Sequence, residues 1–393
     1  MIEKIKELAS KNLNEVITLR RHLHRNPELS FKEFKTSEYI FSALNALSDI
    51  VVKKIAGTGI IAYIKGNTGD KTIALRADMD ALPINEKNEI TYKSENANVM
   101  HACGHDAHMA SLLGTAMILH KLRDYWSGTV ELIFQPGEEK LPGGASVMIR
   151  EGALTNPAPQ AIYAQHVFPS LEIGKVGFRS GAYMASCDEI YLTILGKGGH
   201  AAMRGTYINP ILIASRVLTE LENRFMINTT NDIPAVLAFG KLEAQGATNV
   251  IPQEVRIEGT FRTMNEEWRE HAHKIIRATV AGITDEMGGT FNLRIEKGYP
   301  TLVNNDEVTQ SARRAAEIYL GENNVVTLEM SMTSEDFSFY TLKKPSCFYR
   351  LGTGNKTKGI VSGVHTPTFN IDENSLEIGM GLMAYIAYCD LMR

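Results

Sequence analysis

The chain has 393 residues, with 41 lysines and arginines against 45 aspartates and glutamates, which gives a formal net charge of −4 at pH 7. This balance provides no basic field for nucleic acid or for an anionic membrane surface, so we expect a small-molecule partner. At about 150 residues per domain, the length predicts two or three domains.

Two features of the sequence bear on the compartment in which the protein works. Residues 1–13 alternate charged with apolar residues and contain no apolar run long enough for a secretory signal, and no membrane-spanning segment is evident elsewhere. The cysteines, Cys103, Cys187, Cys347 and Cys389, are too far apart for a disulfide framework. We therefore expect a cytoplasmic protein whose cysteines are free thiols.

The N-terminal part of the chain predicts two helices followed by three strands. Apolar residues at three- and four-residue spacing indicate a helix over residues 4–24, ended by Pro27, and a second helix over 34–46. His22 and His24 fall in the last turn of the first helix, where a histidine more often complements the helix dipole than binds metal. Short apolar runs predict strands at 51–55, 60–65 and 72–75.

Polar residues directly follow three predicted strands. These residues are Asp78 and Asp80 after strand 72–75, Glu138 and Glu139 after strand 130–134, and Gln165 and His166 after strand 161–164. In open α/β sheets, ligands bind outside the carboxyl ends of the strands, so we expect these side chains to share one crevice. Alternating strands and helices predict an α/β fold, a mostly parallel sheet flanked by helices.

The chemically densest stretch is MHACGHDAHMA, residues 100–110. One glycine separates Cys103 from His105, which lets the backbone turn tightly enough for a thiolate and an imidazole to face one centre. Asp106 stands at the expected N-cap of the next helix, whose spacing predicts a single buried face. These residues alone leave three interpretations open: a metal site, a cysteine nucleophile, or a polar loop without chemistry.

Residues 179–296 predict a separate domain inserted into the first. The order strand, helix, strand, strand, helix, strand is that of a ferredoxin-like α+β unit. The elements are expected at 188–195, 209–224, 235–243, 254–262, 266–287 and 290–297. We therefore expect a catalytic domain made of residues 1–178 and 297–393 around this insert.

The resumed catalytic domain carries two further polar segments. Ser334 is expected to cap a short helix that begins at Glu335 and Asp336. His365 lies in a loop before Pro367. Around them we expect a helix at 306–320, a strand at 347–351 and a final helix at 374–392.

The polar side chains after strands and in loops form the donor inventory of a two-metal hydrolase. They are Cys103, His105, Glu138, Glu139, His166 and His365, with Asp78 and Asp80 nearby. Two divalent cations about 3.5–4 Å apart can polarise a carbonyl and lower the pKa of a bridging water from about 15.7 toward about 7. A general base must still take the proton of that water, and the pair Glu138-Glu139 suits a division into base and ligand. Each donor alone is more often a solvated or structural residue, but their coincidence favours the joint interpretation.

Several motifs together resemble the N-acyl amino acid amidohydrolases of the zinc aminopeptidase and carboxypeptidase clan. In chain order they are RRHLHRNPELSF, LRADMDALP, MHACGHDAH, FQPGEE, GKGGHAA, NVIP, SEDFSF and FYRLGTG. They extend over nearly the whole chain, and the most similar branch includes hippurate hydrolases and plant auxin-amino acid hydrolases. The resemblance is specific for the family and much less so for the substrate.

The resemblance implies a role for each donor. The metal ligands that it implies are Cys103, His105, Glu139, His166 and His365. Cys103 takes the place of a bridging aspartate used by other branches. Glu138 is implied as the general base and later as the acid that protonates the leaving amine. Asp80 matches an acid that orients the site, whereas Asp78 stands where other branches carry a histidine ligand and is not assigned to metal.

The resemblance also implies that the inserted domain is a lid and a dimer interface. His200 would reach the active site of a neighbouring subunit and stabilise the developing oxyanion. Asn249 and Arg262 are candidates to hold the substrate, and the arginine suits a carboxylate. A purely structural role remains open for all three residues.

One loop departs from the family pattern. After GGHAAM the family usually has a proline and, further on, an aspartate before the helix proline, where this chain has Arg204, Gly205 and Asn209. The added charge and the more flexible loop beside His200 could change the acyl-group preference or loop closure. The implied metal ligands are unaffected.

Together these inferences predict a metal-dependent amidohydrolase that cleaves N-acyl-L-amino acids to a carboxylic acid and a free amino acid. The alternatives are a dipeptidase or carboxypeptidase on the same scaffold, a hydrolase with Cys103 as nucleophile, and a catalytically silent metal-binding oligomer. Two divalent ions per subunit are expected, and zinc, manganese, cobalt and nickel all suit the ligands. We also expect a homodimer or higher homo-oligomer; the sequence leaves the acyl group and the amino acid side chain open.

Overall fold

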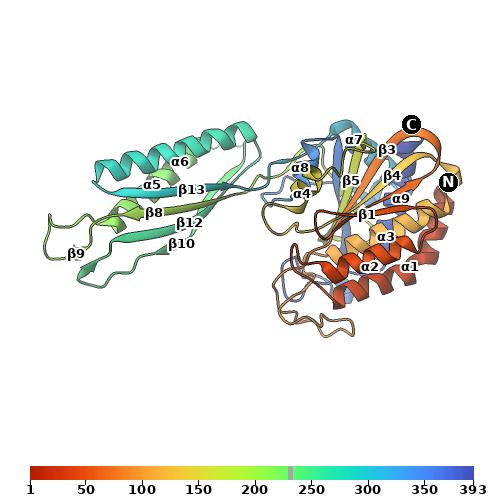
Figure 1. Ribbon diagram of the computed structural model, residues 1–393, viewed down its shortest axis with the longest axis horizontal. Coiled ribbons are helices and arrows are strands. Elements are labelled where there is room, and N and C mark those ends of the chain that lie inside the picture. Colours follow the sequence, from red (N-terminus) through yellow and green to blue (C-terminus); the bar gives the residue numbers. More distant parts are fainter. Residues whose placement is uncertain (229–232) are drawn as a thin grey trace. The chain divides into compact units, whose positions relative to one another are not determined.

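The computed structural model describes residues 1–228 and 233–393, which form two compact units (Figure 1). The first unit consists of Met1–Gly181, Val303–Glu329 and Asp336–Arg393, and the second of Ala182–Leu302 and Met330–Glu335. The insert expected at residues 179–296 overlaps the second unit, which also includes the short return at Met330–Glu335.

The first unit is organised around an eight-stranded sheet with the strand order β1-β2-β4-β3-β5-β16-β6-β15. The central strands β4, β3, β5 and β16 are parallel to one another, and β1 and β2 form antiparallel pairs with their neighbours. Strand β6 is antiparallel to β16 but parallel to β15. The expected α/β fold with a mostly parallel sheet is therefore confirmed.

The strands and helices that were predicted for the first unit occur in the predicted order along the chain. The strands of the sheet are β1 (Val51–Ile55), β2 (Gly59–Lys65), β3 (Asn67–Asp78), β4 (Ser127–Gln135), β5 (Ala161–Glu172), β6 (Val176–Phe178), β15 (Val325–Thr327) and β16 (Ser346–Gly354). The helices are α1 (Ile2–Arg25), α2 (Phe34–Asn45), α3 (His105–Lys121), α4 (Gly144–Arg150), α7 (Asp306–Leu320), α8 (Ser338–Thr341) and α9 (Ser375–Leu391). Short 3-10 helices occur at η1 (Arg123–Tyr125), η2 (Glu322–Asn324) and η3 (Lys356–Lys358), and strands β7 (Gly181–Met184) and β14 (Leu302–Asn304) lie where the chain passes between the units.

Helix α3 is buried around most of its circumference, so the expected single buried face is wrong. The helix packs against β3 and β5 of the sheet and is covered by α1 and α9 (Figure 1). Gly114 permits the close approach, because a Cβ there would lie 2.7 Å from Met380 Sδ and 2.9 Å from Val16 Cγ2. The Thr115 hydroxyl group lies within hydrogen-bond distance of carbonyl oxygens of α3 and α9, at 2.9 Å from Ser111 O and 3.0 Å from Met380 O.

The start of α3 also differs from the sequence prediction. Gly104, not Asp106, precedes the helix, in a left-handed conformation with φ +85°. A Cβ at Gly104 would lie 2.4 Å from Val167 Cγ2, so the position has room only for glycine. Asp106 instead lies in the first turn, where its Oδ2 accepts a hydrogen bond from Arg20 Nε at 2.7 Å.

Two further boundaries correct the sequence analysis. His166 lies inside β5 and not beyond its end, because β16 pairs alongside and extends the strand, with Arg350 opposite His166. The short helix α8 begins at Ser338, so Ser334 does not cap it. Asp336 precedes this helix and is buried, where it accepts hydrogen bonds from other segments.

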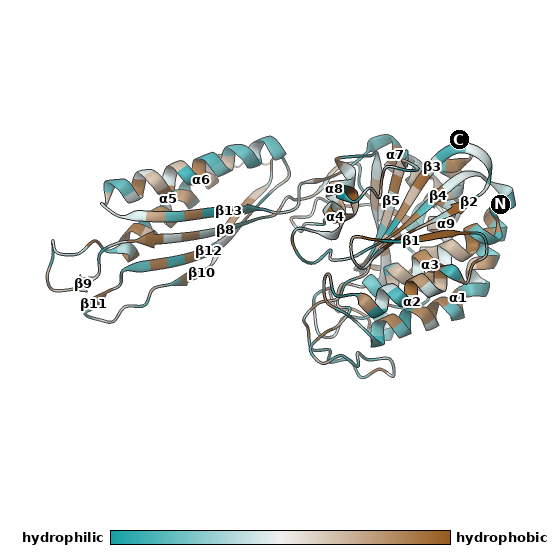
Figure 2. Ribbon diagram, in the orientation of Figure 1, coloured by the Kyte–Doolittle hydropathy of each residue, from teal (hydrophilic) through white to brown (hydrophobic). Residues whose placement is uncertain are grey.

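The second unit is a four-stranded antiparallel sheet with the order β10-β12-β8-β13. This is the strand order of the expected ferredoxin-like unit. The elements are β8 (Asp188–Leu195), β9 (Gly199–His200), α5 (Pro210–Asn228), β10 (Ala235–Glu243), β11 (Val250–Ile251), β12 (Glu254–Thr263), α6 (Glu266–Glu286) and β13 (Thr290–Lys297). Apolar residues alternate along the strands (Figure 2), and Ile190, Leu192 and Ile194 of β8 enter the core beneath α5 and α6.

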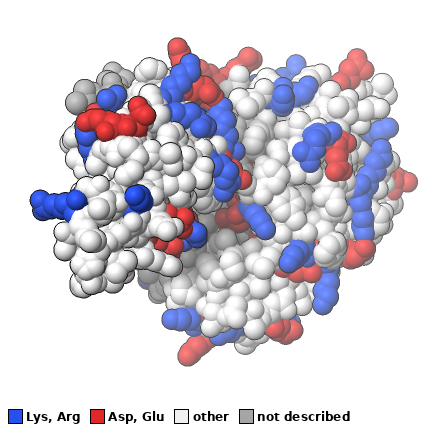
Figure 3. All heavy atoms as spheres, turned by 60° about the vertical axis from the view of Figure 1, so that its left-hand side comes forward, with Lys and Arg blue, Asp and Glu red and all other residues white. Residues whose placement is uncertain are grey.

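Lysine and arginine side chains are interspersed with aspartate and glutamate over the face shown in Figure 3. Among the helices that the structure describes, none combines the length and the apolar character needed to cross a membrane.

Glu131 of β4 is a buried acid outside the polar cluster. The hydroxyl group of Tyr63 on the neighbouring strand donates to its Oε1 at 3.4 Å, and its Oε2 has no hydrogen-bond partner among the described residues. Burial raises the pKa of Glu131 to about 8 from an ordinary value of 4.5, and the hydrogen bond from Tyr63 opposes this shift. The folded protein therefore holds a proton at neutral pH that the unfolded chain releases.

We predict that Glu131→Gln makes the protein more stable than the unmodified chain, increasingly so as pH rises. A raised folded-state pKa contributes stability that is complete below pH 4.5 and is lost as pH rises through about 8. The difference in unfolding free energy should grow by up to about 1.4 kcal/mol per pH unit between these values. Denaturant unfolding at several pH values measures it, with exposed Glu7→Gln as the control. A difference independent of pH would contradict the prediction.

Candidate active site

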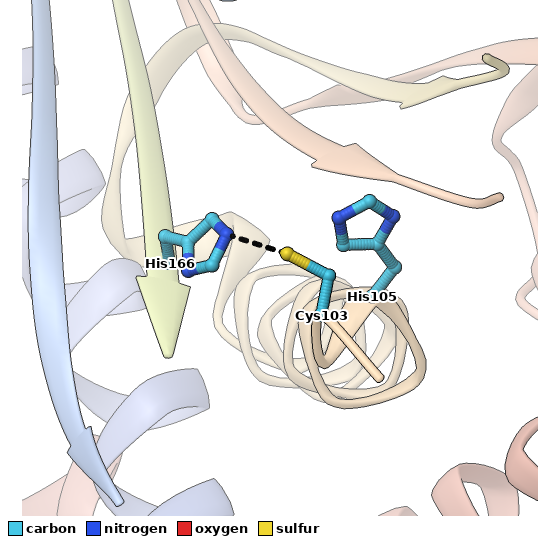
Figure 4. Close-up of side chains that lie close together, drawn as sticks. All are labelled: Cys103, His105 and His166. Carbon is cyan, nitrogen blue, oxygen red and sulfur yellow. Dashed lines mark hydrogen bonds between the residues drawn. The ribbon is translucent and has the colours of Figure 1, made fainter. Parts of the chain in front are cut away.

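Three predicted donors converge at the start of α3 and the facing strand β5 (Figure 4). Cys103 lies in the loop before the helix, His105 is the first helical residue, and His166 projects from β5. The Cys103 sulfur lies 3.4 Å from His166 Nε2. One possible ligand atom from each of the three residues lies within 4.8 Å of the others, and all three side chains are buried.

A second group of donors shares Cys103. Glu139 from the turn after β4 and His365 from the loop before α9 lie with the thiol, again with ligand atoms within 4.8 Å of one another. His365 Nε2 is 3.2 Å from Glu139 Oε1. Because Cys103 belongs to both groups, its sulfur occupies a position between them. Glu138 is also within reach, in a group with His105 and Glu139.

The backbone of His365 is held in an uncommon conformation. Its φ is +61°, a region that costs energy for a residue with a side chain. The N–H of His365 donates to the carbonyl oxygen of Ala102 at 2.8 Å. This hydrogen bond ties the C-terminal loop directly to the segment that carries Cys103, so residues more than 250 positions apart come together.

Backbone carbonyl groups fix the orientation of two imidazoles. His105 Nδ1 lies 2.8 Å from the carbonyl oxygen of Asp80, and His166 Nδ1 lies 2.7 Å from the carbonyl oxygen of Val167. A carbonyl oxygen can only accept a hydrogen bond, so each Nδ1 carries a proton and each Nε2 can offer a lone pair. This is the arrangement of a metal-binding histidine with a hydrogen-bonded outer nitrogen.

The hydrogen bonding and the chemistry of the donor side chains are those expected of a site for a divalent cation. Among the described residues, His105 Nε2 is buried without a hydrogen-bond partner, and Glu139 Oε1 lies between two imidazoles, 3.9 Å from His105 Nε2 and 3.2 Å from His365 Nε2. Buried polar atoms are rarely left without a partner, since their desolvation is costly. Soft thiolate, imidazole and carboxylate donors around these atoms form a ligand set that first-row divalent metals accept.

The electrostatics of the centre also favour a cation. Burial lowers the pKa of His105, but the nearby carboxylates of Asp78, Asp80 and Glu139 outweigh it and raise the pKa to about 10. Burial, and then the charges of Glu139 and Glu138, raise the pKa of Cys103 well above its usual value. Negative charge is thus concentrated here, and a positive ion would stabilise both the thiolate and the carboxylates.

The same shifts disfavour Cys103 as a nucleophile. An activated cysteine needs a lowered pKa and a base that accepts its proton. Burial and Arg350 lower the pKa of His166 well below its usual range, while the pKa of Cys103 is raised. Both changes oppose a thiolate and imidazolium pair in the absence of a cation.

Asp80 lies at the centre of the hydrogen bonds that support the donors. Its carboxylate accepts the backbone N–H of Glu138 at 3.0 Å and that of Glu139 at 2.9 Å. It also accepts from Ser30 Oγ at 2.6 Å, and its own carbonyl oxygen holds His105. Burial raises the pKa of Asp80, but the hydrogen bond and charge of His105, together with the hydrogen bonds from Ser30 and the backbone of Glu139, outweigh burial and lower the pKa overall.

Asp78 is engaged by two side chains that the sequence analysis did not single out. Arg76 NH1 donates to Asp78 at 2.7 Å, and His108 Nδ1 donates to it at 2.6 Å. His108 Nε2 in turn accepts the backbone N–H of Val167 at 2.9 Å, next to His166. Asp78 therefore supports the strand that carries His166, and its nearer oxygen is 3.7 Å from His105 Nε2.

A second missed group surrounds Asp336. Its carboxylate accepts hydrogen bonds from Arg76 NH2 at 2.9 Å, from Gln135 Nε2 and from the backbone N–H of Ala145. The backbone N–H of Asp336 lies 3.4 Å from Glu138 Oε1. The available signal was the presence of Arg76 and Gln135 in otherwise apolar strands, where a buried polar residue requires a partner.

The predicted substrate-binding residues belong to the second unit, not to this cluster. His200 is exposed in β9, which pairs with β11, and the carbonyl oxygen of neighbouring Asn249 accepts a hydrogen bond from Ala201 N. Arg262 on β12 donates to the carbonyl oxygen of Met332 at 3.0 Å. His200 and Asn249 therefore lie close together, whereas Arg262 lies on the four-stranded sheet of the second unit. Among the positions that depart from the family pattern, Gly205 has a φ of +87° in the exposed turn after β9.

Comparisons with known proteins agree with this geometry. The chain is 39% identical over 305 residues to the N-acyl-L-amino acid amidohydrolase of Geobacillus stearothermophilus, covering 78% of this chain and 82% of that one. It is 35% identical over 391 residues to thermostable carboxypeptidase 2 of Saccharolobus solfataricus, covering 98% of each. The crystal structure of the Bacillus subtilis YXEP protein, described as a dinuclear metal-binding peptidase from the M20 family, matches with a TM-score of 0.84 and 33% identity, over 98% of this chain and 99% of that one.

A protein-family model also matches this chain. The model of peptidase family M20/M25/M40 matches residues 74–388, which include the predicted donors of the first unit. The resemblance noted in the sequence and the expected class of enzyme, a metal-dependent hydrolase, are confirmed. The chain therefore belongs to peptidase family M20/M25/M40.

Proposed function

We propose that the protein hydrolyses the amide bond of N-acyl-L-amino acids and releases a carboxylic acid and a free amino acid. The observation that carries this proposal is the turn after β4, which presents two adjacent carboxylates, Glu138 and Glu139, beside a thiol and three imidazoles. The similarity to a named N-acyl-L-amino acid amidohydrolase supports this substrate class.

In this proposal Cys103, His105, Glu139, His166 and His365 hold two divalent ions. Zinc, manganese, cobalt and nickel all suit these ligands. When bound, such ions polarise the substrate carbonyl and lower the pKa of a water molecule. Cys103 belongs to both donor groups, which supports its assignment as a ligand.

The chain's own residues move the protons. A carboxylate oxygen of Glu138 takes the proton from the attacking water and later delivers it to the nitrogen of the leaving amine. Asp80 keeps this carboxylate in place, because it accepts the backbone N–H groups of both Glu138 and Glu139. The N–H of Asp336 lies 3.4 Å from Glu138 Oε1 and further restricts its orientation.

The second unit contributes substrate contacts in this proposal. His200 of a second copy donates a hydrogen bond to the oxyanion that develops at the carbonyl carbon. Asn249 and Arg262 hold the substrate, and the guanidinium group of Arg262 is well suited to its carboxylate. The exposed position of His200, next to Asn249, supports its role as a contact between copies in a homodimer or higher homo-oligomer.

The free thiols of Cys103, Cys187, Cys347 and Cys389 support a reducing, cytoplasmic compartment.

A carboxypeptidase or dipeptidase activity is the second candidate. The identity of 35% with a protein named thermostable carboxypeptidase 2, over 98% of both chains, favours it specifically. Both reactions cut an amide next to a free carboxylate, so the same donors would serve either. They differ only in whether the acyl part carries an amino group.

We predict that Glu138→Gln lowers kcat by about 10²–10⁴-fold, because the amide cannot accept the proton of water. Metal content should stay near that of the unmodified protein, since the proposed ligands remain. Amine release measures kcat, and elemental analysis measures the metal content. The control is Glu172→Gln, a substitution of an exposed residue. Loss of metal together with activity would make Glu138 a ligand, and unchanged activity would remove it from the reaction.

Cys103→Ser should weaken metal binding by more than the 10–100-fold that substitutions of supporting residues typically cause. A serine hydroxyl is a poorer ligand than a thiolate and cannot occupy the shared position as well. Competition with a chelator measures the affinity, and Cys187→Ser, in the second unit, is the matched control. Full metal binding without turnover would instead support a nucleophilic Cys103.

Chelation should abolish amine release, and re-addition of zinc, manganese, cobalt or nickel should restore it to different extents. We expect N-acyl amino acids such as hippurate to be cleaved with higher kcat/KM than dipeptides of matching side chains. A preference for dipeptides would select the second candidate. Turnover of neither class with any of these metals would reject both.

A further inference from the structure

The segment PELSF, which follows α1, belongs to a motif to which the proposed function gives no role. Its residues contact the segment that carries Asp80. The backbone N–H of Ala81 donates to the carbonyl oxygen of Glu28 at 2.8 Å, and Ser30 Oγ donates to Asp80 Oδ2 at 2.6 Å. Three residues beyond Ser30, the side chain of Glu33 is fully buried. A buried carboxylate at this position calls for an explanation, because its desolvation is costly.

Glu33 accepts hydrogen bonds from three separate parts of the chain. Its Oε1 accepts the backbone N–H of Phe31 at 2.8 Å and that of Gly137 at 2.9 Å. Its Oε2 accepts from Thr58 Oγ1 at 2.7 Å. The contact with Gly137 joins the N-terminal segment to the residue immediately before Glu138.

The turn after β4 is consequently held by a row of backbone N–H groups. Gly137, Glu138 and Glu139 donate in succession: the first to Glu33 and the other two to Asp80. Successive N–H groups that point to one side form a concave site for negative charge. Here two buried carboxylates from different segments fill that site.

A steric contact reinforces these hydrogen bonds. Gly137 has a φ of +56°, and a Cβ at this position would lie 2.5 Å from Cζ of the Phe31 ring. Phe31 itself has a φ of +62°, a conformation that its N–H contact with Glu33 stabilises. The turn is therefore clamped between the ring of Phe31 and the oxygen of Glu33. Its carbonyl side is held by Gly144, whose N–H donates to the Gly137 oxygen at 2.9 Å.

We propose that Glu33 is a positioning residue that sets the turn from which Glu138 and Glu139 reach the reaction centre. This inference rests on the proposed function, in which Glu138 moves the proton and Glu139 binds metal. Glu33 acts through the peptide N–H of Gly137 and does not touch the substrate. What it must supply is a hydrogen-bond acceptor at Oε1, which a carboxylate and a carboxamide both provide.

Glu33→Ala should lower kcat by about 10–100-fold, with KM changed by less than about twofold, because the base is displaced while the substrate contacts remain. Metal affinity should fall by about 10-fold, since Glu139 lies on the same turn. Glu33→Gln should restore both quantities to within about threefold of the unmodified protein. Glu33→Asp, whose oxygens are withdrawn by one methylene, should resemble Glu33→Ala and is the variant to use if the alanine form does not fold.

Thr58→Val is the matched control. It removes the hydrogen bond to the other oxygen of the same carboxylate and leaves the Gly137 contact in place. We expect kcat and metal affinity to be unchanged in this variant, even if its thermal midpoint falls. All activities are expressed per folded, metal-loaded centre, at a temperature well below each midpoint, and affinities are measured by chelator competition.

Three results would overturn the proposal. Folded Glu33→Ala or Glu33→Asp with unchanged kcat and metal affinity would show that the turn does not need this acceptor. Equal losses in Thr58→Val would attribute the effect to general packing, and failure of Glu33→Gln to restore function would attribute it to charge. If the unmodified protein cleaves neither acyl amino acids nor dipeptides, the proposed function fails, but the affinities of these variants still test the positioning role.

Discussion

The double hydrogen bond from the backbone of Glu138 and Glu139 to the carboxylate of Asp80 is the contact on which the centre depends. Strands β3 and β4 are parallel neighbours, with Asp78 opposite Gln135, so their carboxyl ends deliver Asp80 and the Glu138 turn to the same place. The carbonyl oxygen of Asp80 also orients His105. One residue thereby sets the relation between the turn after β4 and the first residue of α3.

A high density of buried acids makes this arrangement costly without compensation. Arg76 is buried and binds both Asp78 and Asp336, which explains an arginine within an inner strand. An uncharged His108 cannot neutralise a carboxylate, but its Nδ1 donates a hydrogen bond to Asp78. These partners bind the supporting acids, and a cation at the proposed centre would balance the charge of Glu139 and of a Cys103 thiolate.

Two segments far apart in the sequence meet through the end of α1. Arg20 is fully buried and donates to Asp106 in the first turn of α3, at 2.7 Å, and to Asn370 in the loop that follows His365, at 3.1 Å. His24 bonds to Asp106 at 2.8 Å and to Glu86 at 3.1 Å, so its partners are carboxylates and not only the helix end. Burial lowers the pKa of His24, but Asp106 and Glu86 raise it overall.

The sequence by itself determined the fold class, the inserted ferredoxin-like unit and the bounds of several elements. Strands at 188–195, 235–243 and 290–297 and the helix at 306–320 have the predicted limits, because periodicity and capping residues are local signals. It also supplied the candidate donors and the family, since motifs such as MHACGHDAH keep their order along the chain.

Only the tertiary structure decided how those donors are arranged and supported. The position of Cys103 in two donor groups, the hydrogen bonds of Asp80 and the roles of Arg76, His108 and Asp336 all involve partners from distant segments. The burial of α3 around most of its circumference likewise depends on α1 and α9, which cover it. Local sequence fixes backbone conformation and the identity of a polar group, but the partner that satisfies a buried polar group is chosen by packing between segments.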